Sequence, residues 1–220
     1  LLAVCDVDST HLAAAAAAVE KKTGRKPAQY ADFRKLLESQ EIDAVICGAP
    51  DHWHALVSTL ACQAGKDVYC EKPLTLTIQE GRIMTQVARA TKRIVQTGSQ
   101  QRSDDKFRKG CELVRNGAIG KLKSVRVGLT YVNFNPEPVP DSEPPAELNY
   151  DLWLGPAPWR AYNKNRVHYN FRFYWDYSGG QMTNWGAHHL DIGQWGLGMD
   201  DSGPVAIEAT AKFDPRKRFE

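Results

Sequence analysis

The sequence has no apolar run long enough to cross a bilayer and no strong excess of charge of either sign. Of its 220 residues, 28 are Lys or Arg and 26 are Asp or Glu, so the formal net charge is +2. A membrane-spanning helix needs roughly 20 consecutive apolar residues, and the alanine run at 13–18 leads directly into Val19-Glu20-Lys21-Lys22. We therefore expect neither a membrane nor a nucleic acid as a partner of this chain.

Cysteine is sparse, and its spacing suggests no pairing. The five cysteines are scattered and include no Cys-x-x-Cys pair, which argues against a disulfide framework and favours a reducing compartment. His52 stands two residues before His54, and His188-His189 stands close to Asp191, but neither spacing matches a common zinc pattern. We therefore expect a cytoplasmic protein and no metal site.

A glycine-rich phosphate-binding fingerprint is also missing. The chain opens inside an apolar run, Leu1–Cys5, without an initiator methionine, and it stops soon after a strand-like run at 205–211. In a dinucleotide-binding unit the fingerprint precedes the ribose-binding acid by about 20 residues. We therefore expect a fragment that lacks the first strand with its Gly-rich loop and the C-terminal end, and that binds NAD weakly or not at all.

What is present in the first half is an alternation of short apolar strands with helices. The pattern predicts strands at 1–5, 44–47, 67–70 and 93–96, and helices at 9–23, 33–39, 54–64 and 78–91. Such an alternation is typical of βαβ units and a parallel sheet. We predict an α/β fold whose first domain, residues 1–102, is an incomplete Rossmann unit.

The character of the sequence changes after residue 103. The pattern predicts a helix at 107–116, a long alternating strand at 122–132, a loop rich in proline and acid at 135–147, and a helix at 182–195. Aromatic residues crowd the stretch 150–195; most of them must pack in a core, although such rings also suit the apolar faces of sugars. We assign residues 103–220 to a second, incomplete domain that binds substrate and forms the oligomer.

Two strand ends carry candidate functional residues. Lys72 follows the strand 67–70 and precedes Pro73, which disfavours helical backbone at the lysine. The carboxyl ends of parallel strands are where open α/β sheets bind ligands, so we expect Lys72 to meet a substrate; a plain surface lysine is the alternative. Asp6 ends the first strand and is a candidate for the adenosine ribose, or else a helix-capping acid. With Asp8 nearby, the acids favour NAD over NADP.

A third candidate lies in the helix predicted at 182–195. Asn184, His188 and Asp191 are spaced i, i+4 and i+7, so they share one helical face. His188 is suited to accept a proton from a hydroxyl near neutral pH; a satisfied, buried histidine at a domain interface is the alternative. We expect Asn184, Asp191, Arg102 and Tyr177 to bind the substrate hydroxyls.

Motifs along nearly the whole chain resemble one family. They are Ala49-Pro50-Asp51-His52-Trp53-His54, Ala64-Gly65-Lys66-Asp67-Val68, Glu71-Lys72-Pro73-Leu74 and Gly179-Gly180…Asn184-x-Gly186-x-His188-x-x-Asp191. Their order and spacing resemble the Gfo/Idh/MocA oxidoreductases, the relatives of glucose-fructose oxidoreductase and inositol dehydrogenase. The resemblance implies a Rossmann domain followed by an α+β domain with a large open, mainly antiparallel sheet. It also implies homodimers or homotetramers.

The resemblance assigns roles to particular residues. It implies that Lys72 and His188 are catalytic, and that Asn184 stands where many members have an aspartate, so its amide orients a hydroxyl without adding charge. It adds to Asp6 further residues along the cofactor, namely Pro50, His54, Glu71, Lys72 and Gln100, with Trp159 and Arg160 near its nicotinamide end. The implied reaction moves a hydride between a sugar or polyol hydroxyl and NAD(P). Two alternatives stay open: a redox-neutral glycoside hydrolase that retains NAD, and a non-catalytic protein that binds a dinucleotide or a sugar.

Overall fold

The computed structural model describes residues 1–130, 134 and 136–212, and strands and helices alternate along its first half. The elements in chain order are β1 (Ala3–Cys5), α1 (Ser9–Thr23), β2 (Ala28–Tyr30), α2 (Phe33–Leu37), β3 (Ala44–Cys47), α3 (Asp51–Gln63), β4 (Asp67–Glu71), α4 (Ile78–Thr91) and β5 (Val95–Gly98). β1 pairs with β2, and β3, β4 and β5 pair in that order, all in parallel. The predicted α/β fold is confirmed.

Local signals fix the ends of these helices. Asp8 caps α1 by accepting hydrogen bonds from the backbone N–H groups of Thr10 and His11, and Gly24, whose φ of 70° suits glycine, caps the C-terminal end of α1. α3 begins at Asp51, three residues before the predicted start, because Pro50 serves as its N-cap residue and Asp51 joins the first turn. An acid there favours helix initiation, and the earlier start brings Asp51 and His52 into the helix.

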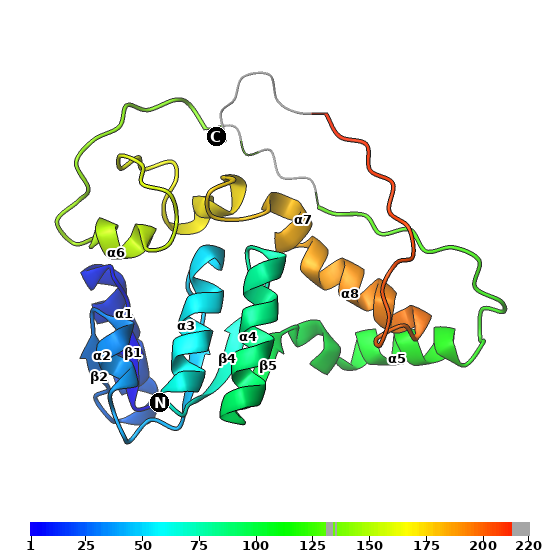
Figure 1. The fold of residues 1–220 in the computed structure, drawn as a ribbon, viewed down its shortest axis with the longest axis horizontal. Helices are drawn as coiled ribbons and strands as arrows, with labels where there is room; N and C mark the ends of the chain where they lie inside the picture. Colours follow the sequence, from blue (N-terminus) through cyan, green and yellow to red (C-terminus); the bar gives the residue numbers. More distant parts are fainter. Residues whose placement is uncertain (131–133, 135, 213–220) are drawn as a thin grey trace.

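An aliphatic core lies between the sheet and its helices. The most deeply buried side chains come from α3, β4 and α4; α3 packs against both of the others, and the three stand together at the centre of Figure 1. They are Ala61, Cys62, Val68, Cys70 and Met84. All five cysteines are free. Removal of these apolar groups from water is the main stabilising contribution in this half.

The second half is built from short helices. They are η1 (Gln100–Ser103), α5 (Asp105–Arg115), α6 (Tyr150–Leu154), η2 (His168–Phe173), α7 (Gly180–Asn184) and α8 (Gly186–Leu197). α5 packs against α8, and α6 lies above α1 (Figure 1). Their core is aromatic; its buried members are Leu148, Tyr150, Trp153, Leu154, Val167, Phe171, Tyr174 and Tyr177.

Two predictions for the second half differ from the structure. Residues 122–130 and 205–211 form no strand, and the described residues from 103 onward contain no sheet; residues 131 and 132 of the first predicted strand lie outside the described residues. An alternating sequence forms a strand only where another strand supplies hydrogen bonds. The helix predicted at 182–195 is divided at Trp185 into α7 and α8.

Backbone and side-chain contacts join the two halves. Asp8 and Leu148 form an isolated antiparallel bridge, and the N–H of Asn149 donates to the carbonyl of Val7 at 2.9 Å. Gly155 closely faces the Trp53 ring, since a Cβ there would lie 1.9 Å from a ring carbon. Within the described ranges, no helix is both long and apolar enough to span a membrane.

Candidate active site

Lys72 links the end of β4 to the second half of the chain. Its Nζ donates to the backbone oxygen of Asn184 at 3.1 Å and to Asn184 Oδ1 at 2.8 Å. The Lys72–Pro73 peptide bond is cis. Gly98 on the neighbouring strand leaves room for Glu71, because a Cβ at Gly98 would lie 3.0 Å from the Cα of Glu71. The structure therefore brings together Lys72 and Asn184, two residues that the sequence predicted for one site.

The charge of Lys72 is held in an unfavourable environment. Burial lowers the pKa of Lys72, and the positive charge of Arg172 lowers it further, while Asp51 and Glu71 act in the opposite direction. A desolvated ammonium group interacts strongly with a developing negative charge, because water screens it less. Lys72 is thus suited to stabilise an oxyanion.

His188 lies in the first turns of α8, close enough to Lys72 to be affected by its charge. Burial lowers the pKa of His188, and the charge of Lys72 lowers it further. Its Nδ1 is buried and has no hydrogen-bond partner among the described residues. A neutral imidazole with a free ring nitrogen is able to accept a proton. The amide of Asn184 is fixed within α7, since its Nδ2 donates to Gln181 Oε1 at 3.1 Å.

The first turn of α3 contacts the second half at several points. Ser178 Oγ donates to Asp51 Oδ2 at 2.5 Å, and burial raises the pKa of that carboxyl. His52 Nε2 and Trp53 Nε1 both donate to the carbonyl of Trp153 at 3.0 Å. Burial lowers the pKa of His52 to about 4, so this imidazole is neutral. These buried polar bonds fix the second half relative to the sheet.

His54 links the loop after β3 to the loop after β4. Its Nδ1 lies 2.6 Å from the carbonyl oxygen of Pro73, and its Nε2 lies 2.7 Å from that of Ala49. Only a doubly protonated ring donates to both oxygens. Burial opposes that charge, but Cys70, Pro73 and Asp51 together raise the pKa of His54. His54 is buried, and its bond to the Pro73 carbonyl positions the loop that carries Lys72 from the protein interior.

A pocket of about 580 Å³ opens at the carboxyl ends of β1 and β3. Asp6, Asp8, Gly48, Ala49 and Pro50 line it from the first half, and Trp153, His168 and Arg172 line it from the second. The predicted ribose acid and Pro50 therefore share one pocket. Lys72 and His188 are not among its lining residues. A volume of this size suits a cofactor or a similar small molecule.

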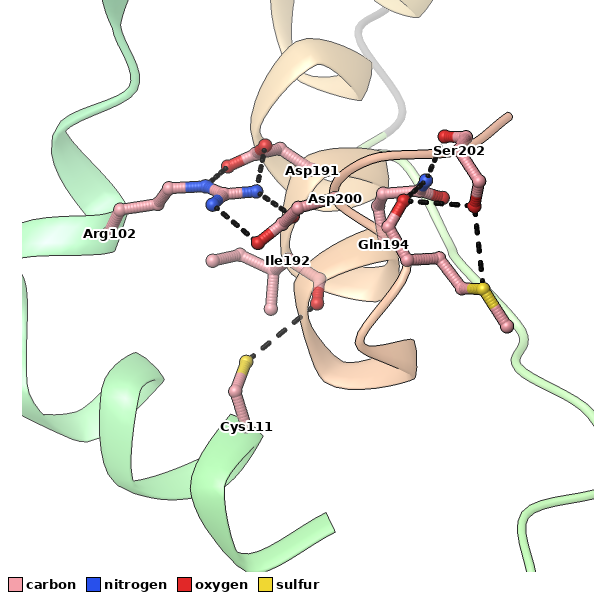
Figure 2. Close-up of polar contacts among 8 residues, drawn as sticks. Arg102, Cys111, Asp191, Ile192, Gln194, Asp200 and Ser202 are labelled. Atoms are coloured by element: carbon pink, nitrogen blue, oxygen red, sulfur yellow. Dashed lines mark hydrogen bonds and ion pairs between the residues drawn. The ribbon is translucent and has the colours of Figure 1, made fainter. Parts of the chain in front are cut away.

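Arg102 and Asp191, both predicted to bind substrate, contact each other. Figure 2 shows the Arg102 guanidinium between Asp191 and Asp200, with Nε–Oδ2 and Nη2–Oδ1 distances of 2.8 Å to Asp191. Asp200 Oδ1 lies 2.8 Å from Nη2. These carboxylates raise the pKa of Arg102. The bidentate pair ties η1 to α8, and Cys111 of α5 contacts the carbonyl of Ile192 beside it.

The other predicted site residues lie in different environments. Tyr177 is completely buried in the aromatic core, so contact with a substrate would require it to leave that core. Trp159 is 78% exposed, and Arg160 Nε donates to Asp176 Oδ2 at 2.7 Å. Gln100 is exposed in η1. Their roles stay predictions.

Sequence reasoning missed the pair of Asp51 and Ser178 and the charge of Arg172. Asp51 belongs to the motif at 49–54, but no local pattern in that motif indicates that its partner is Ser178. Ser178 precedes Gly179-Gly180, which is the only signal near it.

Comparison with known proteins covers both halves. Residues 1–99 match the model of an oxidoreductase family described as an NAD-binding Rossmann fold. Residues 114–217 match the C-terminal alpha/beta domain of the same oxidoreductase family.

Individual relatives are similar over part of their length. An oxidoreductase of Rhizobium meliloti is 31% identical over 65% of this chain and 42% of its own. Inositol 2-dehydrogenase of Salmonella paratyphi B is 30% identical over 67% of this chain and 42% of its own. The crystal structure of an oxidoreductase domain protein from Kribbella flavida superposes with a TM-score of 0.64 at 25% identity, over 90% of this chain and 45% of that one.

The chain thus spans about two fifths of the length of these curated relatives. Both family models and the relatives agree with one another. The chain belongs to the Gfo/Idh/MocA oxidoreductase family.

Proposed function

We propose that the protein carrying this chain transfers a hydride between a sugar or polyol hydroxyl and NAD. The observation that carries the proposal is the group at the end of β4, where Lys72 bonds to Asn184 at 2.8 Å and His188 lies on the helix that follows. A cation can stabilise developing negative charge, an amide can orient a hydroxyl and a neutral imidazole can accept its proton, so the three groups together suit the oxidation of a hydroxyl.

In the proposed mechanism each side chain has one task. Asn184 orients the substrate hydroxyl, and Lys72 lowers the pKa of that hydroxyl through its charge. His188 accepts the proton, which its lowered pKa permits at neutral pH. When bound, the nicotinamide supplies the redox chemistry by taking up the hydride. The Arg102–Asp191 ion pair positions α8, and with it His188, against η1.

The residues of the pocket fit a dinucleotide. Asp6 follows β1 where a Rossmann unit places its ribose-binding acid, and the carboxylates of Asp6 and Asp8 line the same wall. Two acids there disfavour a 2′-phosphate, so NAD fits better than NADP. Pro50 lines the pocket at the end of β3, and Glu71, Gln100, Trp159 and Arg160 are proposed to extend the cofactor site toward Lys72.

The substrate class follows from the site and its relatives. Inositol 2-dehydrogenases, whose name describes oxidation of a cyclic polyol, are similar to this chain at about 30% identity. We extend that chemistry to this protein as a small sugar or polyol. We also propose that the protein is cytoplasmic, since five free cysteines suit a reducing compartment. The family resemblance is the basis for proposing a homodimer or homotetramer.

The test uses the purified protein that carries this chain, with NAD and a panel of sugars and polyols that includes inositol. We expect NADH absorbance to rise with at least one of them. Lys72→Met removes the charge but keeps the length of the side chain, and it should lower kcat roughly 10²–10³-fold while NAD affinity stays largely intact. Lys109→Met, at an exposed position of α5, is the matched control. Unchanged turnover in Lys72→Met would remove Lys72 from the mechanism.

A second result would redirect the proposal. Retention of NAD without any net reduction, together with cleavage of aryl glycosides, would identify the redox-neutral glycosidase. NAD binding without turnover of the sugars and polyols or of the aryl glycosides would indicate a non-catalytic binding protein.

A further inference from the structure

Two histidines and a carboxylate from distant parts of the sequence meet at the start of α1. Asp8 caps α1, His11 lies in its first turn, and His168 begins η2. One ligand-type atom from each of them lies within 4.8 Å of the others. Asp8 is buried, whereas both imidazoles are exposed, and all three residues line the rim of the pocket.

The two oxygens of Asp8 have different partners. Oδ1 accepts the backbone N–H groups of Thr10 and His11 at 2.9 and 3.1 Å. Oδ2 accepts no hydrogen bond from the described part of the chain, and His168 Nε2 lies 3.8 Å from it. That distance is too long for a hydrogen bond. It is close to the roughly 3.4 Å that separates two ligands each about 2.1 Å from a tetrahedral zinc ion.

The backbone at His168 is unusual. Its φ is +52°, a left-handed conformation that residues other than glycine seldom adopt and that recurs at functional sites. This conformation sets the His168 ring edge-on to His11, with the centroids 4.9 Å apart. Neither ring has a side-chain hydrogen bond within the residues that the structure describes. Their nitrogens are therefore available as ligands.

The chemistry of the three donors selects the ion. Two imidazole nitrogens and one carboxylate oxygen suit zinc and its neighbours in the transition series, whereas magnesium and calcium prefer oxygen ligands alone. A second group of metal-ligating residues, Cys47, His54 and Cys70, also lies within 4.8 Å. It is a poorer candidate, because both ring nitrogens of His54 already face carbonyl oxygens.

We propose that Asp8, His11 and His168 bind one divalent transition-metal ion, zinc by preference, at the rim of the pocket. The ion joins the start of α1 to η2 and so fastens the second half of the chain over the pocket wall that holds Asp6. Three protein ligands leave one tetrahedral position for water or for an oxygen atom of a bound molecule. This site is separate from Lys72 and His188, and it does not depend on the proposed hydride transfer.

The experiment measures metal binding directly. The protein is freed of metal with a chelator and titrated with Zn²⁺ by calorimetry and with Co²⁺ by absorption spectroscopy. We expect one ion per chain and a rise in Tm with Zn²⁺ that Mg²⁺ does not reproduce. His11→Ala, His168→Asn and Asp8→Asn should each weaken Zn²⁺ binding by at least about tenfold.

The variants are chosen to keep the fold intact. Asparagine remains a good helix cap at position 8 and tolerates the left-handed backbone at position 168, while His11 is exposed. His189→Asn is the control, since its ring bonds to the carbonyl of Gly128 away from the site, and it should bind Zn²⁺ as the parent does. The absence of stoichiometric binding, or equal affinity in the parent and all three site variants, would overturn the proposal.

Discussion

The core of the first half consists of aliphatic and sulfur-containing side chains, whereas the core of the second half consists mainly of aromatic rings. The first half is ordered by parallel strands and by helices of up to 15 residues. Among the described residues of the second half there is no strand, and its helices near the junction have five or six residues. Short helices are marginal by themselves, so the second half depends on ring packing and on bonds to the first turn of α3. The site lies where these two kinds of structure meet.

The largest effect expected is from truncation of the aromatic core. Trp153 is buried, stacks on Tyr150 and meets Tyr177 edge-on, so Trp153→Ala should lower the free energy of unfolding by about 3–5 kcal/mol. Met84→Ala, in the aliphatic core, is the matched change and should lower it by about 2–5 kcal/mol. Chemical denaturation measures both.

Hydrogen exchange then tells whether the two cores are independent. Trp153→Ala should speed exchange in α6 and η2 and leave β3–β5 protected, while Met84→Ala should do the reverse. If either variant speeds exchange equally in both halves, the cores unfold as one unit and the distinction between them fails.

The next largest effect is a loss of stability in acid, which arises at His52, where α3 contacts the second half. Burial lowers the pKa of His52 from its usual 6.5 to about 4. The folded state therefore binds fewer protons than the unfolded state, and stability is complete above pH 6.5 and is lost as pH falls through about 4. A shift of this size corresponds to roughly 3 kcal/mol.

His52→Gln tests this linkage. The glutamine amide retains an N–H donor for the carbonyl of Trp153 but does not titrate in this range. We expect the fall in unfolding free energy between pH 6.5 and 4 to become shallower in His52→Gln and to persist in His189→Gln. An unchanged slope in His52→Gln would assign the acid sensitivity to other groups.

Local pattern predicted most of the first half and little of the second. The strands at 44–47 and 67–70 and the helices at 9–23 and 78–91 are confirmed to within a residue or two, because burial in a parallel sheet leaves a periodic apolar signal. β2 was missed because its three residues, Ala-Gln-Tyr, are too few to establish an alternating pattern. The strand predicted at 122–132 was wrong for 122–130, since alternation alone supplies no neighbouring strand.

The residues of the candidate site also divide into those that the sequence predicted and those that it did not. Lys72, Asn184 and His188 could be found from motifs, because each motif is short and contiguous. The bond between Ser178 and Asp51 and the meeting of His168 with Asp8 join residues far apart in sequence, so spacing could not reveal them. The expectation of no metal site likewise rested on sequence spacing alone.

The smallest effect expected is at the cap of α6. Asn149 Oδ1 accepts the N–H of Leu152 at 3.0 Å, and Asn149→Ala removes this bond at a cost of about 1 kcal/mol. The backbone bond from Asn149 to Val7 is independent of the side chain and should persist. Asn149→Asp keeps the capping oxygen and is the control. Thr77→Ala removes the equivalent bond of α4, a helix of 14 residues.

The cap variants separate local from global effects. Both losses should lower the free energy of unfolding by similar amounts, but α4 has further turns packed on α3, whereas α6 has hardly more than one turn. Faster hydrogen exchange should therefore spread through all of α6 in Asn149→Ala and stay in the first turn of α4 in Thr77→Ala. Unchanged exchange throughout α6 in Asn149→Ala would show that ring packing holds this helix without its cap.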